Sequence, residues 1–207
     1  MKKLLFGILA FTIISCNNSE PINYTLFSGT ITNANSKTIT ITDSDVAIRT
    51  IKVSDTGTFS DTIFNANGYY TFGNGKETSA MYLKDGYNIQ LNMDAKEFDE
   101  TIVYSGIGSD INNFLAQKKI IKNKTEPFPV IYSLDETAYL TKMNQQKETL
   151  EGLLAGLDTD FIKQEKVNIK YDYIIHVMRY ELAHRYFTKK EDFKVSESFP
   201  KVFKDFK

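Results

Sequence analysis

The first half of the chain alternates apolar and polar residues in short runs. Residues 38–42 alternate strictly, and β-branched Thr and Ile favour the half-buried surface of a sheet. Turn residues separate the runs, and Asp85-Gly86 between two apolar runs is typical of a two-residue hairpin. Because no helical pattern interrupts these runs, we predict an antiparallel β-sandwich at 24–105. About eight strands are expected, at 24–32, 37–42, 47–53, 58–64, 69–73, 77–83, 87–93 and 99–104.

The second half has helical periodicity instead. Ser109 or Asp110 can cap a helix that runs to about Lys122, and 125–132 carries two prolines and is interpreted as a linker. Residues 133–136 match a capping box, which predicts a second helix that ends near Gly156. A third and longest helix is expected at about 159–187. The fold class is therefore α+β, with the sandwich followed by a helical segment of about three helices at 106–190.

One apolar stripe follows the third expected helix, and such a stripe is either core or a contact surface. An extended tail at 191–207 is also rich in apolar residues for a chain end. The stripe consists of Tyr171, Ile174, Ile175, Met178, Leu182 and Tyr186, and the apolar tail residues are Phe193, Phe199, Val202, Phe203 and Phe206.

The N-terminal residues have the layout of a secretory signal. Lys2 and Lys3 precede an apolar run at 4–14, which would span about 16 Å as a helix against the ~30 Å of a membrane core. The run ends in Ser15-Cys16, where a small residue precedes the only cysteine of the chain, as at a lipoprotein cleavage site. We therefore predict a signal peptide at 1–15, lipid attachment at Cys16 and a lipidated tether at 16–23, which together place the protein on a membrane.

Composition and charge narrow the function classes. The chain is 42 % hydrophobic and 25 % charged, as expected of a globular protein. The formal net charge is −1, and loss of the two leader lysines makes it −3. A near-neutral chain has no field that attracts a phosphate backbone, so nucleic-acid binding is not expected.

Residues that could support catalysis or metal binding are few. The two histidines, His176 and His184, lie about 80° apart around a helix axis, which is unfavourable for one shared metal ion. We interpret Asp172 with His176 and Glu181 with His184 as surface pairs on the helix. No catalytic residue, cofactor or metal site is predicted. The other candidates are interpreted as turns and a strand exit, and as a solvated acidic cluster: Gly73, Gly75, Gly106 and Gly108, and Asp94, Glu97, Asp99 and Glu100.

Four short motifs occur in a familiar order after the lipid-attachment signal. They are FSGTI at 27–31, VSDTGTF at 53–59, MYLKDGY at 81–87 and GIGSDINNFL at 106–115. The arrangement resembles the N-terminal region of membrane-anchored TlpA-like thiol-disulfide oxidoreductases. In that family a β-sandwich domain and a helical segment precede a thioredoxin domain. The resemblance covers the chain after the leader, but the Cys-x-x-Cys pair that thiol exchange requires is missing.

The resemblance and the missing thiols together define the expected function. We expect a non-catalytic, lipid-anchored module in the cell envelope of a Gram-negative bacterium, facing the periplasm. It would hold or orient a partner, a thioredoxin-like protein or its client, and either a truncated gene product or a standalone docking module fits the tail. The alternative is a lipoprotein that binds a small ligand or glycan through tyrosines of the sandwich, namely Tyr69, Tyr70, Tyr82 and Tyr87.

Overall fold

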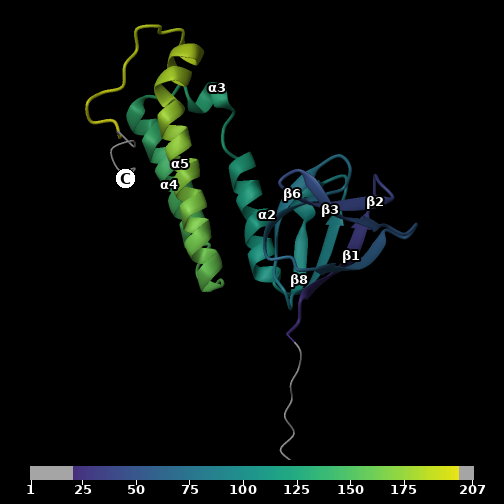
Figure 1. The fold of residues 1–207 in the computed structure, drawn as a ribbon. Coiled ribbons are helices and arrows are strands. Elements are labelled where there is room, and N and C mark those ends of the chain that lie inside the picture. Colours follow the sequence, from purple (N-terminus) through teal and green to yellow (C-terminus); the bar gives the residue numbers. More distant parts are fainter. Residues whose placement is uncertain (1–20, 201–207) are drawn as a thin grey trace, which may run out of the picture.

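The computed structural model describes residues 21–200, so Cys16, the leader and Val202, Phe203 and Phe206 lie outside the described residues. The described chain forms a β-sandwich beside a helical segment (Figure 1). Its strands are β1 Tyr24–Thr32, β2 Thr38–Asp43, β3 Val46–Lys52, β4 Thr58–Phe64, β5 Gly68–Gly73, β6 Thr78–Leu83, β7 Asn88–Asp94 and β8 Val103–Ile107. Its helices are α1 Phe98–Thr101, α2 Ser109–Asn123, α3 Phe128–Ile131, α4 Glu136–Gly152 and α5 Thr159–Thr188.

Two four-stranded sheets face each other, with strand orders β4-β1-β7-β8 and β3-β2-β5-β6. Because successive side chains of a strand point to opposite faces, the alternating runs place their apolar side chains between the two sheets. Phe27 of β1, for example, lies 5.0 Å from Phe59 of the same sheet and 6.2 Å from Phe72 of the opposite sheet, measured between ring centroids. The predicted α+β class, a sandwich followed by helices, is confirmed.

The prediction of a hairpin at Asp85-Gly86 is wrong. The turn itself forms, with Gly86 at φ 87° and the Tyr87 N–H donating to the Lys84 carbonyl at 3.0 Å. However, β6 and β7 lie in different sheets, and β7 pairs with β1 in parallel, an exception to the antiparallel pattern. The same turn chemistry serves a hairpin and a crossing between sheets, so local sequence cannot distinguish them.

The strand expected at 99–104 is displaced. Phe98–Thr101 forms the short helix α1, and β8 starts only at Val103. Thr101 stabilises this turn because its hydroxyl donates to the Glu97 carbonyl at 2.7 Å and accepts from the Asp94 N–H at 2.8 Å. Phe98 is 2 % exposed and stacks on Phe72, so the helical turn closes the end of the sandwich core.

The long helices lie close to their predicted bounds, but the capping of α4 differs. Asp135, rather than Ser133, caps α4 by accepting from the Ala138 N–H at 2.9 Å. Ser133 donates to the Pro129 carbonyl in the α3 turn, which replaces part of the expected linker. Glu136 accepts hydrogen bonds from the N–H and the hydroxyl of Ser196, so the capping-box glutamate holds the tail instead.

The described part of the tail, 191–200, packs on the helices without regular structure. Phe199 is 6 % exposed and stacks on Tyr180 of α5, with 5.1 Å between the ring centroids. Phe193 lies 4.2 Å from the ring of His184. This segment therefore completes the core between α4 and α5.

Two consecutive asparagines of α2 close the edges of both sheets. The Asn112 side chain accepts from the N–H of Tyr82 on β6 and donates to its carbonyl, both at 2.9 Å. Asn113 does the same to Tyr104 on β8, at 2.8 and 2.9 Å. Because β6 and β8 are edge strands of different sheets, the two amides occupy the hydrogen-bonding positions of a further strand on each sheet.

A second set of contacts, beside those of Asn112 and Asn113, connects the sandwich to α5. The Glu165 carboxylate accepts from Tyr69 of β5 at 2.6 Å, from Lys118 of α2 at 2.7 Å and from Asn168 at 2.9 Å. Phe161 lies beneath it, within 5.8 Å of the rings of Tyr69 and Tyr82. Glu165 is completely buried, and a buried carboxylate is tolerated only with a full set of donors.

Replacing Asn112 by Ala should lower the free energy of unfolding by about 2–4 kcal/mol, because it leaves the Tyr82 N–H and carbonyl without partners at a buried joint. Asn112→Asp should also destabilise, since a carboxylate would then face the carbonyls of Tyr82 and Gly108 that the amide now contacts. Urea unfolding monitored by circular dichroism measures both effects.

The matched control is Asn144→Ala on the exposed side of α4, which should change stability by less than about 0.5 kcal/mol. Equal effects of Asn112→Ala and Asn144→Ala would contradict the role assigned to the α2 amides.

Candidate functional site

The most prominent surface feature is a row of exposed apolar side chains on α5. They follow one another at intervals of 4, 4, 3, 4 and 4 residues, which keeps them on one face of a helix. All are 42–72 % exposed, and Leu182 is the most exposed. This α5 stripe consists of Val167, Tyr171, Ile175, Met178, Leu182 and Tyr186.

The opposite face of the same helix lies in the core. Val177 and Tyr180 are buried in the cluster that α5 forms with α4, and Ile169 is buried in the cluster that contains Phe161. The sequence predicted a stripe but not its exposure. Ile174, which was included in it, is 6 % exposed and belongs to the core side, whereas Val167 was missed although it lies one turn before Tyr171.

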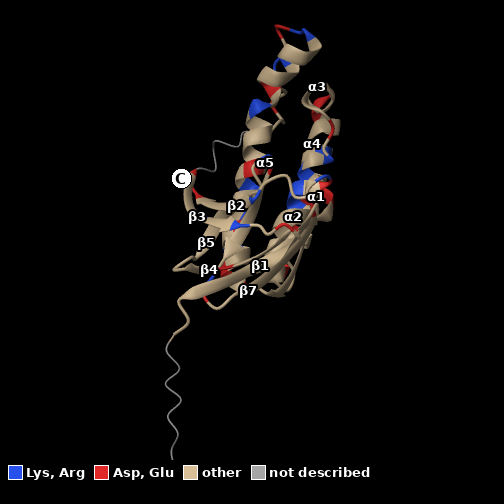
Figure 2. Cartoon of the chain, turned by 90° about the vertical axis from the view of Figure 1, so that its right-hand side faces the viewer, with Lys and Arg blue, Asp and Glu red and all other residues tan. Residues whose placement is uncertain are grey.

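Charged residues border the α5 stripe on one side. Arg179 is exposed, and Asp172 retains 38 % side-chain exposure while pairing with Lys122 at 2.9 Å and Lys118 at 3.6 Å. Acidic and basic residues are interspersed along α4 and α5 (Figure 2), so neither sign of charge dominates these helices. The stripe is thus an apolar band with a mixed polar margin, which is typical of a protein-binding surface.

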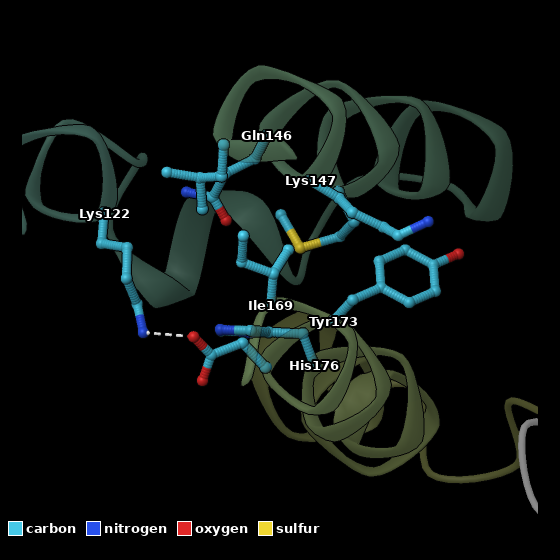
Figure 3. Close-up of a pocket in the computed structure, with 9 residues that line it drawn as sticks. Lys122, Gln146, Lys147, Ile169, Tyr173 and His176 are labelled. Carbon is cyan, nitrogen blue, oxygen red and sulfur yellow. Dashed lines mark hydrogen bonds and ion pairs between the residues drawn. The ribbon is translucent and has the colours of Figure 1, made fainter. Parts of the chain in front are cut away.

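The predicted surface pair of Asp172 and His176 lies on a small pocket between α2, α4 and α5 (Figure 3). The pocket measures about 20 Å³, enough for about one water molecule, so it cannot hold a substrate. His176 Nδ1 lies 3.0 Å from the hydroxyl of Tyr132. Burial, together with the charge of Lys122, lowers the pKa of His176 below its ordinary value.

The predicted surface pair of Glu181 and His184 is wrong. His184 is 4 % exposed, with Nδ1 2.9 Å from the carbonyl of Tyr132, because the tail residue Phe193 covers it. Glu181 instead accepts from Arg185 and from the Val195 N–H. Within 21–200, no group of three or more His, Cys, Asp or Glu side chains could hold a metal ion.

The four tyrosines considered for glycan binding are half-buried in internal contacts. Tyr69 and Tyr82 pack against the helical cluster, and Tyr70 and Tyr87 pack against the sandwich core. Burial, followed by the hydrogen bond to Glu165, raises the pKa of Tyr69 far above its ordinary value, so its hydroxyl remains a donor. All four rings are therefore only partly exposed.

A groove of about 490 Å³ runs between the sandwich, α2 and α5. Lys118, Lys119 and Lys122 line it, but each pairs with a carboxylate, respectively Glu165, Asp99 and Asp172. These ion pairs neutralise the groove.

The residues of the acidic cluster lie at the end of β7 and in the turn of α1. Asp94 accepts from Asn33, and Asp99 accepts from Asn123. Glu97 and Glu100 are exposed. Each of these carboxylates therefore either has an amide partner or is exposed to solvent.

Gly75 and Gly108 lie in turns, whereas Gly73 ends β5 and Gly106 lies within β8. Gly75 and Gly106 have φ of 91° and 89°. Gly108 has φ 92° and precedes α2, and a Cβ there would lie 2.2 Å from the ring of Tyr87.

Comparison with known proteins adds little. No family model and no curated protein matches the chain. A crystal structure of a DUF3823 family protein from Parabacteroides merdae is similar to part of it, with 17 % identity, a TM-score of 0.27, and coverage of 35 % of this chain and 45 % of that protein. The match thus spans less than half of that protein. Within residues 21–200, no helix has the length and apolar character needed to cross a membrane.

The lowered pKa of His176 predicts how stability depends on pH. The folded protein protonates this histidine less readily than the unfolded chain does, so the unfolded chain takes up the proton first as pH falls below about 6.5. The free energy of unfolding should therefore decrease between pH 7.5 and pH 5, and it should decrease less in His176→Gln. Urea unfolding of both proteins at the two pH values isolates this contribution, because all other groups are common to them. Identical losses would contradict it.

Proposed function

We propose that this protein is a non-catalytic, lipid-anchored module of a Gram-negative cell envelope, periplasm-facing, that holds a partner protein against α5. The observation that carries the proposal is the α5 stripe, six apolar side chains that are 42–72 % exposed on a helix fixed to the sandwich. Apolar patches of this size on soluble proteins often mark a site where a partner binds.

The attachment rests on the N-terminal sequence. Two lysines, a short apolar run and Ser15-Cys16 are what a lipoprotein signal peptidase and the acylating enzyme require. Lipid on Cys16 would use the only thiol of the chain. The resemblance to the N-terminal region of TlpA-like oxidoreductases supports an accessory role, and a thioredoxin-like protein or its client is the class of partner that it suggests.

Cys16→Ser should abolish the membrane attachment. In a Gram-negative host supplied with radiolabelled palmitate, the parent protein should acquire label and sediment with membranes. The Cys16→Ser protein should remain unlabelled, because no other thiol can accept diacylglycerol. Label on the serine variant, or its absence from the parent, would show that Cys16 is not the anchor.

A photo-crosslinking amino acid at position 175 should capture a protein in intact cells, because Ile175 lies near the middle of the stripe. The same amino acid at position 166 is the control, since Lys166 is exposed on the other side of α5. Crosslinked products should appear on gels from position 175 and not from position 166. No product from position 175, or equal products from both positions, would refute the proposed docking role.

A further inference from the structure

In place of the thioredoxin-like partner or client that the resemblance suggests, we propose that the occupant of the α5 stripe is a second copy of this chain, whose own α5 stripe packs against it in the antiparallel direction. The inference rests on the proposed function, because it identifies the occupant of the surface that function requires. Three properties of the stripe support it: its spacing, its area and the charges at its margin.

The spacing is that of a helix–helix seam. Tyr171, Ile175, Met178 and Leu182 follow each other at 4, 3 and 4 residues, the alternation with which two long helices pack side by side. Val167 and Tyr186 extend the band one turn at each end. The stripe runs along about 28 Å of the 30-residue helix α5, so a second helix of equal length covers it completely.

The area is also sufficient for a homodimer. The six side chains expose on the order of 500 Å² of apolar surface per copy. An interface of standard size buries about 800 Å² per partner, and homodimer interfaces are about 65 % apolar, so each copy needs about 520 Å² of apolar surface. The apolar area of the α5 stripe is of this order.

The marginal charges favour the antiparallel direction. In the register that places Ile175 opposite Met178 of the second copy, residues on the same margin of the two helices become neighbours. Asp172 then lies beside Arg179 of the second copy, and the two-fold axis repeats this opposite-charge pair. In a parallel pair, Arg179 would instead lie beside Ile174 of the second copy, which is on the other margin of the stripe. Antiparallel helices also align their dipoles favourably.

Asp172 is able to make this contact. Its ion pairs with Lys118 and Lys122, within the described residues, both use Oδ2, and its side chain is 38 % exposed. Arg179 is exposed one heptad further along the same margin. The internal ion pairs orient Asp172 without covering it.

Disulfide crosslinking of the full chain tests the proposal. The Cys16→Ser protein has no cysteine. Any disulfide in it therefore joins cysteines that were introduced at chosen positions. Tyr171→Cys and Leu182→Cys proteins, mixed and oxidised in mild detergent, should form a mixed disulfide dimer, because these positions face each other in the antiparallel register. Leu182→Cys alone should not, since its two copies would lie about 16 Å apart along the axis, whereas a disulfide needs Cα atoms within about 7 Å. Lys166→Cys is the negative control.

A stripe variant adds an independent arm. Leu182→Glu should reduce dimer formation, measured as mass by sedimentation equilibrium, by at least about tenfold. Because Leu182 is 72 % exposed, this variant should fold with an unchanged urea midpoint. Lys166→Glu should leave the dimer intact.

Three results would overturn the inference: a monomer at all concentrations tested, a disulfide from Leu182→Cys alone, or unchanged association of Leu182→Glu. The photo-crosslinks at position 175 distinguish failure of the second-copy inference from failure of the proposed function. Products of twice the chain mass support the second copy. Products of another mass refute the second copy but keep the docking role, and no product refutes both.

Discussion

The amide side chains of Asn112 and Asn113 hold the two halves of this protein together. Each is bonded to both backbone groups of one edge-strand residue, and the two edges belong to different sheets. A sandwich must protect such edges, because unpaired N–H and carbonyl groups recruit other strands. Here the protection comes from a helix, so α2 cannot detach without exposing both edges.

The position of α5 follows from the position of α2. Lys118 of α2 and Tyr69 of β5 both bond to Glu165 of α5, whose side chain is 1 % exposed. Loss of any of these donors would leave a buried charge insufficiently paired, which costs several kcal/mol. The network therefore fixes the rotation of α5 about its own axis. That rotation directs Ile169, Val177 and Tyr180 into the core and leaves the α5 stripe outside.

Local patterns in the sequence were sufficient for the elements but not for their arrangement. Alternation in 38–42 and helical spacing in 159–187 depend on neighbours in the chain, and both elements form close to these bounds. The sheet to which β7 belongs depends on its pairing with β1, about 60 residues away, and no local signal encodes it. Glu165 was not singled out because a lone glutamate on a helix is usually solvated, and its partners Tyr69 and Lys118 lie 96 and 47 residues away. His184 was misplaced for the same reason, since the tail that buries it has no regular pattern.

The tail also bears on the meaning of the exposed stripe. An apolar helix face can be exposed because the segment of the same chain that would cover it packs elsewhere. On the α4 side of α5 such a layer exists, since Phe193 and Phe199 fill the space beside Tyr180, and Ser196 is bonded to Glu136. The described tail thus covers the face of α5 that is already half-closed by α4, whereas the side chains of the α5 stripe are 42–72 % exposed. A segment that only completed the fold would gain more by covering the larger exposed area, because apolar burial stabilises in proportion to area. The distribution of apolar residues between the two faces of α5 is therefore better explained by two different contacts, one within the chain and one with another protein.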